Sequence, residues 1–396
     1  MRIVFFYSEE EAFNYFTDQL VKEFTARGHE TFVLDLPAID PQRPESYAEF
    51  AAFLSEKVDA VVCFDGLGAR EDMFIEAWDR QDAVVVDILL DPPLRFHATW
   101  EKHPRNYLLL CCDHNHAAYV KKYFGGQVPR VGFMPHAGVR PGPEEAAVPW
   151  GKKKYDILFS GTYYRPGEQF ARITEHFPSG TPMYRFYEAV YQLLKRNSGL
   201  TVEQAVEELL AQLGEEFPEE QKKTILLCSG SVDWAIRMDQ RERVVQTLAE
   251  AGFELYLLGR GWENHPSAGE ANVHRIDGRI PFEKTLGYMS EAKICLNVMP
   301  WFKAGSHERI FNALLRHSLP LTDSSSWISE HFTDGEDIAL YDLNFLEQLP
   351  FITDRLLADE DRTTSMIRRG YEKAAKMYTW ANCADRVLEA VLRREV

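Results

Sequence analysis

The sequence predicts an α/β protein with two domains in series, each built on a parallel, doubly wound sheet. The length of 396 residues is too great for one ordinary core and suits two domains. In both halves, short apolar runs of strand length alternate with stretches that have helical spacing. Between the halves, residues 140–151 hold three prolines and two glycines and break this alternation.

The first half opens with a strand and an amphipathic helix. Phe13, Phe16, Leu20 and Phe24 recur at helical spacing, and Gly28 follows where a helix would end. Apolar runs predict six strands in this half, at residues 3–7, 31–36, 58–64, 83–88, 107–111 and 130–134. Strands that alternate with helices in this way form parallel βαβ units.

The second half repeats the pattern after a linker at residues 141–153. Apolar runs predict strands at residues 155–159, 254–258, 273–276, 293–299, 319–322 and 338–340. A long helical stretch, about residues 166–252, separates the first two and is expected to be an insertion. We therefore expect a first domain at 1–140, a second at 154–379, and a closing helix at 380–396.

Composition and charge exclude several classes of protein. The chain is 45% hydrophobic and 27% charged, as globular proteins are, and no apolar run reaches the length of about 18 residues that a membrane span needs. The net charge of −17 argues against binding to nucleic acid or anionic membranes. The start lacks the features of a signal peptide, which predicts a cytoplasmic protein whose six cysteines are buried free thiols.

In open α/β sheets, ligands bind beyond the carboxyl ends of the strands, so the loops there are the candidates for chemistry. The loop 299–309 ends in Gly305 and Ser306, and Ser306 is a good N-cap for the helix that follows. A helix N-terminus suits a diphosphate, and Lys303, His307 and Arg309 add charge or donors. The alternative is an ordinary solvated turn, and spacing alone does not separate the two.

Two more loops follow strands of the second half. Each offers glycine for close backbone approach or hydroxyl groups, although a tight turn explains either one alone. Their candidate residues are Gly161, Thr162 and Tyr163 in one loop and Gly259, Arg260, Gly261 and Trp262 in the other. Asp277, after the next strand, could border a nucleobase or simply form a turn.

Several familiar motifs are missing. Glu9, Glu10 and Glu11 follow the first strand in place of the glycine-rich fingerprint of dinucleotide enzymes. His114 and His116 are two residues apart, which makes them diverge on a helix, so residues 112–116 do not predict a metal site. The nucleophile elbow of α/β-hydrolases and the P-loop are also missing.

Three polar residues at strand ends of the first half could act as a general base: Asp65, Asp91 and His136. Each also has an ordinary explanation as a cap or turn residue.

Residues 305–315 read Gly-Ser-His-Glu-Arg-Ile-Phe-Asn-Ala-Leu-Leu and continue to Leu319-Pro320-Leu321-Thr322-Asp323. This segment resembles the C-terminal signature of bacterial GT-B glycosyltransferases of the spore-maturation-protein type, within the broad group-1 glycosyltransferases. Residues 332–338, Trp380 and residues 155–163 also fit that pattern, as do two features of the first half, Asp91-Pro92 and residues 135–138.

The resemblance implies two facing Rossmann-like domains, with the nucleotide-sugar donor on the second and the acceptor on the first. Residues 303–309 would then lie near the donor phosphates, and Gly259 and Gly261 in another donor-side loop. Asn312 falls where the family usually has a Glu that holds the ribose hydroxyls. Either Glu308 takes that role, or donor affinity is lower, or the donor differs. We expect the helical insertion to shape the acceptor side.

The implied reaction is glycosyl transfer from a nucleotide-diphosphate sugar, expected to be a UDP-sugar. The acceptor would be a hydroxyl of a polysaccharide, a protein such as flagellin, or a small molecule. A helix N-terminus and basic side chains can stabilise the departing diphosphate, so we expect no cofactor and no essential metal. If the enzyme inverts, Asp91 is the first choice of base and His136 the second. The closing helix would cross back to the first domain.

Three other functions fit parts of the pattern. A GT-B-fold sugar-nucleotide epimerase would consume the donor without an acceptor. Asn312 could instead mark a module that binds a sugar nucleotide or a partner protein without turnover. A dinucleotide dehydrogenase would bind a nicotinamide cofactor, but the missing fingerprint disfavours it.

Overall fold

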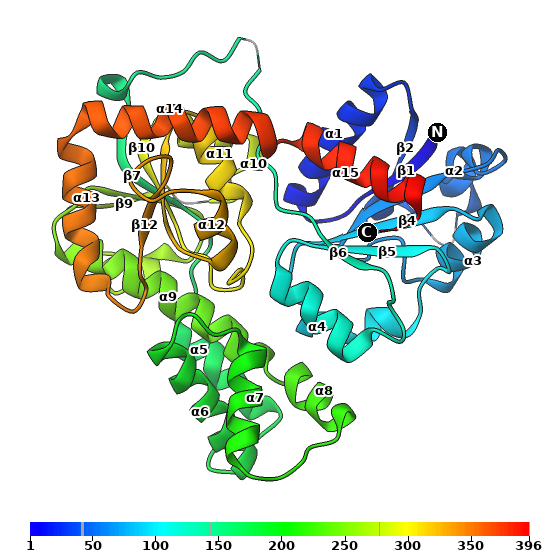
Figure 1. Ribbon diagram of the computed structural model, residues 1–396, viewed down its shortest axis with the longest axis horizontal. Helices are drawn as coiled ribbons and strands as arrows, with labels where there is room; N and C mark the ends of the chain where they lie inside the picture. The colour runs from blue at the N-terminus through cyan, green and yellow to red at the C-terminus, as the bar shows by residue number, and fades with distance from the viewer. Residues whose placement is uncertain (41–42, 143, 277, 396) are drawn as a thin grey trace. The chain divides into compact units, whose positions relative to one another are not determined.

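The computed structural model describes residues 1–40, 43–142, 144–276 and 278–395. The chain divides into two compact units, each with its own sheet (Figure 1). Unit 1 combines Met1–Val139 with Tyr378–Val396, and unit 2 is the continuous segment Arg140–Met377.

Unit 1 is a six-stranded sheet of order β2-β1-β3-β4-β5-β6 in which all neighbouring strands are parallel. The strands are β1 (Arg2–Tyr7), β2 (Glu30–Asp35), β3 (Ala60–Phe64), β4 (Val84–Leu89), β5 (Tyr107–Cys111) and β6 (Val131–Phe133). The helices are α1 (Glu11–Ala26), α2 (Ala48–Phe53), α3 (Asp72–Gln81), α4 (His114–Phe124) and α15 (Trp380–Arg393). The central strands β3, β4 and β5 are buried along their whole length, as parallel strands covered on both faces must be.

The last helix of the chain, α15, completes the core of unit 1 (Figure 1). The ring of Trp380 lies 5.0 Å from that of Phe16 on α1 and 6.2 Å from that of Phe64 on β3. Arg27, just beyond α1, pairs with Asp385 at 2.8 Å. Residues at the two ends of the chain therefore share one hydrophobic core.

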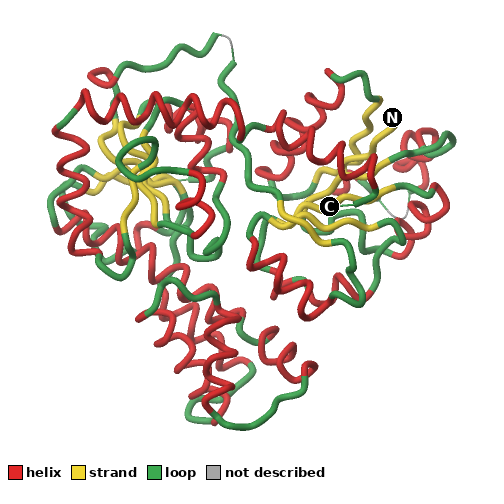
Figure 2. Tube along the Cα trace, in the orientation of Figure 1, coloured by secondary structure: helices red, strands yellow, loops and turns green. Residues whose placement is uncertain are grey.

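Unit 2 is a second six-stranded parallel sheet, of order β12-β11-β10-β7-β8-β9. Its strands are β7 (Tyr155–Ser160), β8 (Leu255–Leu258), β9 (Val273–Ile276), β10 (Ala292–Asn297), β11 (Leu319–Asp323) and β12 (Ala339–Tyr341). Its sheet-covering helices after β9 are α10 (Phe282–Ser290), α11 (Glu308–Leu315), α12 (Ser326–His331), α13 (Leu349–Ala358) and α14 (Glu360–Met377). Figure 2 shows helices on both faces of this sheet, the doubly wound arrangement.

Five helices lie between β7 and β8: α5 (Pro166–Ala171), α6 (Pro182–Arg196), α7 (Val202–Gln212), α8 (Glu219–Leu227) and α9 (Gly230–Glu250). Helices α5 to α8 project away from the sheet of unit 2 as a helical lobe, residues 166–229 (Figures 1 and 2). The second half of α9 does not belong to the insertion. Val244, Val245 and Leu248 pack into the core of the sheet, so α9 is the crossover helix that links β7 to β8.

All twelve predicted strands are present, each within two residues of its expected bounds. The prediction of two α/β units with parallel sheets and a helical insertion in the second is therefore confirmed. The predicted helical stretch, about residues 166–252, is present as α5 to α9. Its last part also covers the sheet, because buried apolar residues of α9 pack into the sheet core from residue 244 onward.

Candidate functional site

Three loops leave the carboxyl edge of the sheet in unit 2, after β7, β8 and β10. These loops carry the donor-side candidates that the sequence predicted, except Asp277 and the candidates on α11. Asp277, which follows β9, lies outside the described residues.

The loops after β7 and β8 cross in direct backbone contact. A Cβ atom on Gly259 would lie 2.5 Å from the carbonyl oxygen of Gly161, and one on Gly261 would lie 1.9 Å from that of Tyr163. Both glycines also have positive φ angles, of 130° and 85°. The amide of Tyr163 donates to the carbonyl oxygen of Arg260 at 2.9 Å. Glycine is therefore required at both positions for the contact between the two loops, and the donor-side role of these glycines stays a prediction.

The two aromatic candidates in these loops, Tyr163 and Trp262, are part of the core. Tyr163 and Trp262 are fully buried and stack with ring centroids 5.2 Å apart. The indole of Trp262 donates to the carbonyl oxygen of Gly161 at 2.8 Å, and the hydroxyl of Tyr163 bonds to Glu242 on α9. These two side chains stabilise the crossed loops from the protein interior. Of the candidate residues in the two loops, Arg260 is the exposed one.

Beneath the crossed loops lies Arg241, a residue that the sequence reasoning missed. Its side chain extends from α9 and donates from Nη1 to the carbonyl oxygen of Thr162 at 2.6 Å. The residue is only 1% exposed, and its Nε has no hydrogen-bond partner among the described residues. Burial and the nearby charges of Arg237 and Arg309 hold the pKa of Arg241 well below its ordinary value. Burying a guanidinium group whose Nε lacks an acceptor is costly, and an anion at this point would offset that cost.

Arg237 and Arg309 complete what we call the arginine cluster, Arg237, Arg241 and Arg309. The guanidinium carbon of Arg237 lies 3.8 Å from the centre of the Trp301 ring and 4.9 Å from that of Trp234. Arg309 donates from Nη1 to the side-chain oxygen of Asn297, at the end of β10, at 2.9 Å. Burial also lowers the pKa of Arg309.

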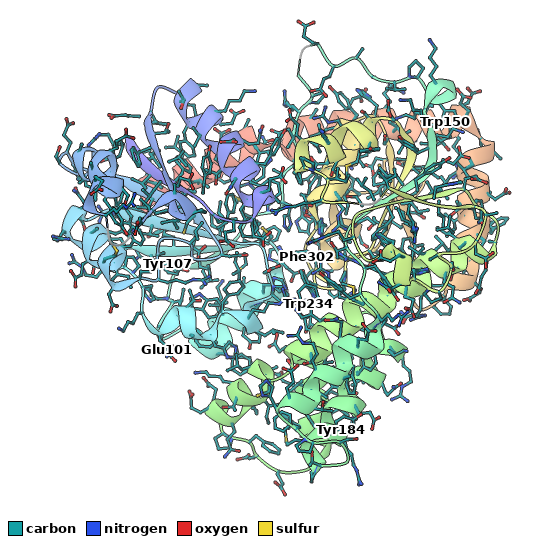
Figure 3. All side chains as sticks on the ribbon, turned by 180° about the vertical axis from the view of Figure 1, so that it is seen from behind. Glu101, Tyr107, Trp150, Tyr184, Trp234 and Phe302 are labelled. Atoms are coloured by element: carbon teal, nitrogen blue, oxygen red, sulfur yellow. The ribbon has the colours of Figure 1, made fainter. Side chains whose placement is uncertain are left out.

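The arginine cluster and the tryptophans beside it come from two parts of the chain that are far apart in the sequence, α9 and the segment that follows β10. Trp234, Arg237 and Arg241 are spaced i, i+3 and i+7 on α9, so they share one face of that helix. Trp301 belongs to the loop after β10, and its ring centroid lies 5.9 Å from that of Trp234. Figure 3 shows Trp234 and Phe302 where the helical lobe meets the sheet of unit 2. The helical spacing was visible in the sequence, but nothing there indicated that α9 passes under these loops.

Negative charge near the cluster is limited. Glu308 is the carboxylate that acts on Arg241 and Arg309, where it opposes the lowering of both pKa values. Its carboxylate also lies close to Nδ1 of His307. Arg241 and Arg309 therefore share one neighbouring carboxylate, which leaves a surplus of positive charge around them.

Lys303 does not add to that surplus. Its ammonium points into the protein, donating to the carbonyl oxygen of Met299 at 3.0 Å and lying 3.6 Å from Asp323. The lysine side chain is 6% exposed. Lys303 thus stabilises the loop after β10 from inside, which corrects its expected place beside a phosphate.

The start of α11 also differs from expectation. The N-cap is His307, whose Nδ1 accepts from the amide of Arg309 at 3.4 Å, and the helix begins at Glu308. Ser306, the expected cap, is fully buried, and its hydroxyl has no partner within the described ranges. Gly305 accepts a bond from the hydroxyl of Ser325 at 2.6 Å. Asn312 is 1% exposed on the inner face of α11, without contact with solvent.

The candidate bases lie at strand ends in unit 1. Asp91 follows β4, is partly exposed and pairs with Arg95 at 3.2 Å. Asp65 follows β3 and accepts from the amides of Leu90 at 2.8 Å and Asp91 at 3.4 Å. Burial and the neighbouring Asp91 carboxylate raise the pKa of Asp65. His136 is 7% exposed and follows β6.

Residues 112–116 have a structural role at the start of α4. Asp113 is the N-cap of that helix, and its carboxylate accepts from the amides of Asn115 at 2.7 Å and His116 at 3.3 Å. Over the described ranges, no group of three or more His, Cys, Asp or Glu side chains is arranged to hold a metal ion. Among the same residues, no helix is long and apolar enough to cross a membrane.

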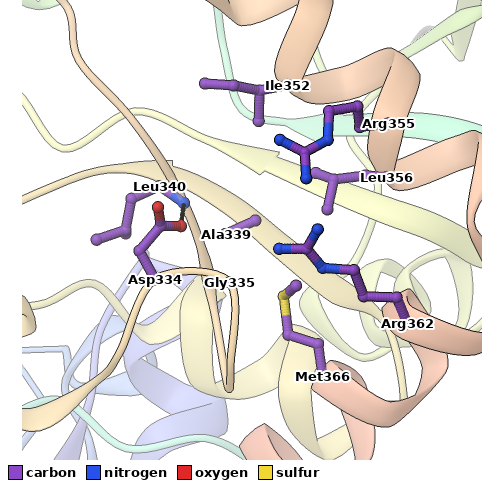
Figure 4. A pocket seen from close by; sticks show the side chains of 9 residues that line it. All are labelled: Asp334, Gly335, Ala339, Leu340, Ile352, Arg355, Leu356, Arg362 and Met366. Carbon is purple, nitrogen blue, oxygen red and sulfur yellow. Dashed lines mark hydrogen bonds between the residues drawn. The ribbon is translucent and has the colours of Figure 1, made fainter.

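A separate hollow of about 110 Å³ lies between the segment that enters β12 and helices α13 and α14 (Figure 4). Arg355 and Arg362 point toward it from the helices, and Asp334 faces it from the loop (Figure 4). In a parallel sheet the segments that enter strands lie at the amino edge, opposite the loops of the arginine cluster. This hollow is therefore not part of the candidate site.

Comparison with known proteins agrees with this geometry. Residues 240–389 match the family model described as glycosyl transferase-like. That range contains Arg241, Arg309, both glycines of the β8 loop and all of α11. A search of curated proteins found no match.

Solved structures with a similar fold include several glycosyltransferases. Sucrose-phosphate synthase from Thermosynechococcus elongatus is 11% identical, with a TM-score of 0.55 over 99% of this chain and 98% of that one. An alpha-glucosyltransferase in complex with UDP is 11% identical, with a TM-score of 0.56 over 99% and 100%. HepE from Anabaena, in complex with UDP and glucose, is 10% identical, with a TM-score of 0.54 over 99% and 100%.

The chain has the two-domain α/β fold of GT-B glycosyltransferases, as these alignments over nearly the whole chain show. Together with the glycosyl transferase-like region, the fold bears out the prediction of a glycosyltransferase enzyme. The finer resemblance to the spore-maturation-protein type stays a prediction.

Proposed function

We propose that this protein transfers a glycosyl group from a nucleotide-diphosphate sugar to an acceptor hydroxyl, and that the arginine cluster binds the diphosphate. The observation that carries the proposal is the buried, incompletely paired Arg241 between Arg237 and Arg309 at the carboxyl edge of the unit 2 sheet. A diphosphate would supply an acceptor oxygen for the buried Nε of Arg241, which has none among the described residues, and negative charge to match the cluster.

The N-terminus of α11 supports the same location. Its first turn follows directly after His307, and Arg309 extends from that turn. The partial positive charge of a helix N-terminus adds to that of the arginines. The buried hydroxyl of Ser306, one residue before the cap, is available to donate to a phosphate oxygen.

In the reaction, the bond between the anomeric carbon and the diphosphate breaks while a bond to the acceptor oxygen forms. Negative charge grows on the leaving diphosphate, and the arginine cluster would stabilise it where it develops. Fixed guanidinium groups can stabilise this charge without a metal ion, so we propose a metal-independent enzyme. The acceptor proton would pass to Asp91 or, as second choice, to His136 if the configuration inverts.

A uridine nucleotide is the proposed donor base. Two of the structures with a similar fold were determined with UDP, which supports this choice. The cytoplasm is the proposed site of action, in keeping with the supply of nucleotide sugars there. The acceptor remains proposed as a hydroxyl of a glycan, a protein or a small molecule.

Calorimetric titration of the protein with UDP tests the proposal, with EDTA present throughout. We expect saturable, metal-independent binding that becomes at least tenfold weaker in Arg309→Gln. Uracil should not compete at equal concentration, since it lacks the diphosphate. Lack of UDP binding by the wild-type protein would refute the donor site.

Turnover separates the enzyme from its rivals. Incubation with a set of UDP-sugars should release UDP slowly by hydrolysis, and faster once an acceptor is present. An epimerase would change the sugar without needing an acceptor. A binding module would hold UDP and release none from any UDP-sugar.

A further inference from the structure

A hollow of about 240 Å³ lies on the helical lobe of unit 2, where α5, the end of α8 and the start of α9 meet. Its lining combines one large aromatic side chain with several hydrogen-bonding groups. The lining residues are Gln169, Arg172, Glu175, His176, Leu227, Cys228, Gly230, Ser231 and Trp234.

This hollow and the arginine cluster lie along the same face of α9. Trp234 lines the hollow and also stacks against the guanidinium of Arg237, whose carbon lies 4.9 Å from the ring centre. Arg237 and Arg241 follow on the same face of α9, one and two turns further along. At 1.5 Å per residue, the seven residues from Trp234 to Arg241 span about 10 Å. A ligand in the hollow would therefore lie within about 10 Å of a diphosphate on the cluster.

The chemistry of the lining favours a carbohydrate. A sugar presents a flat patch of C–H groups that packs on an aromatic face, and a rim of hydroxyls that both donate and accept. Trp234 offers the face, while Gln169, Glu175 and Ser231 offer both kinds of partner. Arg172 and Glu175 carry opposite charges and lie 3.8 Å apart, so the hollow has no net preference for an anion. Its volume suits one ring better than a long apolar chain.

We propose that this hollow binds a sugar ring of the acceptor, so that the helical lobe carries the acceptor subsite next to the donor diphosphate. The inference rests on the proposed function, because it assigns the second substrate of the same reaction. It places an acceptor-binding surface within unit 2, on helices that a minimal α/β domain does not contain.

Saturation-transfer NMR provides the test, with the wild-type protein and saturating UDP. The probes are methyl glycosides of glucose, galactose, mannose and N-acetylglucosamine, with p-nitrophenol as an aromatic molecule that is not a sugar. We expect saturation of ring protons in at least one glycoside. Ser231→Phe, which fills the hollow, and Arg172→Ala should each reduce that signal at least fivefold.

Arg185→Ala is the matched control, since Arg185 is an exposed residue of α6 outside the hollow. It should leave the glycoside signal unchanged. The proposal is overturned if no glycoside is saturated, if only p-nitrophenol is, or if the signal survives both variants. UDP affinity measured on the same samples keeps the two proposals apart, since UDP binding without glycoside binding defeats the acceptor subsite alone.

Discussion

Arg241 donates a hydrogen bond from Nη1 to the backbone carbonyl oxygen of Thr162, at 2.6 Å, and so ties the crossover helix α9 to the loop after β7. The same guanidinium retains a buried Nε without a partner among the described residues. Arg241 therefore fixes the loop after β7 and, on our proposal, also binds the ligand through its remaining N–H group.

This double role predicts opposite effects of Arg241→Met on stability and binding. UDP affinity should fall about 10- to 100-fold, because hydrogen bonds to charged groups contribute about 1.5–3 kcal/mol. Without ligand the variant should melt no lower than the wild type, because a buried cation without a full set of partners is removed. Calorimetry and thermal unfolding measure the two effects. Arg243→Met, on the same helix, is the control and should keep UDP affinity.

The crossing of the β7 and β8 loops predicts a severe effect for Gly261→Ala. The new Cβ would collide with the carbonyl oxygen of Tyr163 at 1.9 Å and would sit at a φ of 85°. We expect a loss of at least about 2 kcal/mol in the free energy of unfolding, measured by urea titration. Gly287→Ala, in the open surface of α10, should be neutral or stabilising. Equal stability of the two variants would contradict the close contact.

Lys153 predicts a pH dependence of stability. Its ammonium donates to the carbonyl oxygen of Ser290 at 2.8 Å and to the hydroxyl of Ser318 at 2.9 Å, and burial lowers its pKa from 10.5 to about 8. Between these pH values the unfolded chain binds more protons than the folded one, so this residue makes the free energy of unfolding rise with pH. The slope is at most about 1.4 kcal/mol per pH unit.

The comparison with Lys153→Met isolates this contribution. Urea titrations of both proteins from pH 7.5 to 10 should show that the wild type gains stability relative to the variant as pH rises. A constant difference across the range would show that the pKa of Lys153 is not lowered by folding.

Asp91 predicts a change in catalysis without a change in donor binding. If Asp91 is the base, Asp91→Asn should lower the turnover of glycosyl transfer about 100-fold or more, because a positioned base contributes about that much. UDP affinity should stay the same, since the proposed role of Asp91 is to take the acceptor proton and it is not part of the arginine cluster. Asp72→Asn, at an exposed ion pair with Lys102, is the control. Unchanged turnover would move the role to His136 or favour a retaining reaction.

The cysteines predict selective labelling. Five of the six are buried, whereas Cys228 is partly exposed and lines the hollow on the helical lobe. Burial raises the pKa of all six thiols, so access of the reagent decides which one reacts. Ellman's reagent should modify about one thiol in the folded protein and all six after denaturation. Labelled protein should still bind UDP but lose the methyl glycoside signal. Rapid reaction of several thiols in folded protein would contradict their burial.

The sequence predicted the strands well because each is an apolar run bounded by polar loops, a local signal. It also placed candidate residues in the loop 299–309, since a strand, a glycine and a helix start are adjacent there. It could not predict which of the charged side chains of this loop point into the protein. Lys303 and Arg309 look equivalent in the sequence, yet the first pairs with Asp323 inside the protein and the second joins the cluster. Arg237 and Arg241 became visible only when tertiary packing brought α9 under the loops.

Helix α15 has a consequence for the order of events on the ribosome. Unit 1 needs Trp380 and its neighbours to close its core, and these are synthesised after the whole of unit 2. Unit 2 is continuous and can fold as soon as residue 377 leaves the exit tunnel. The core of unit 1 can therefore be completed only after α15 has been synthesised. The part of the chain that is made first is thus the last to finish folding.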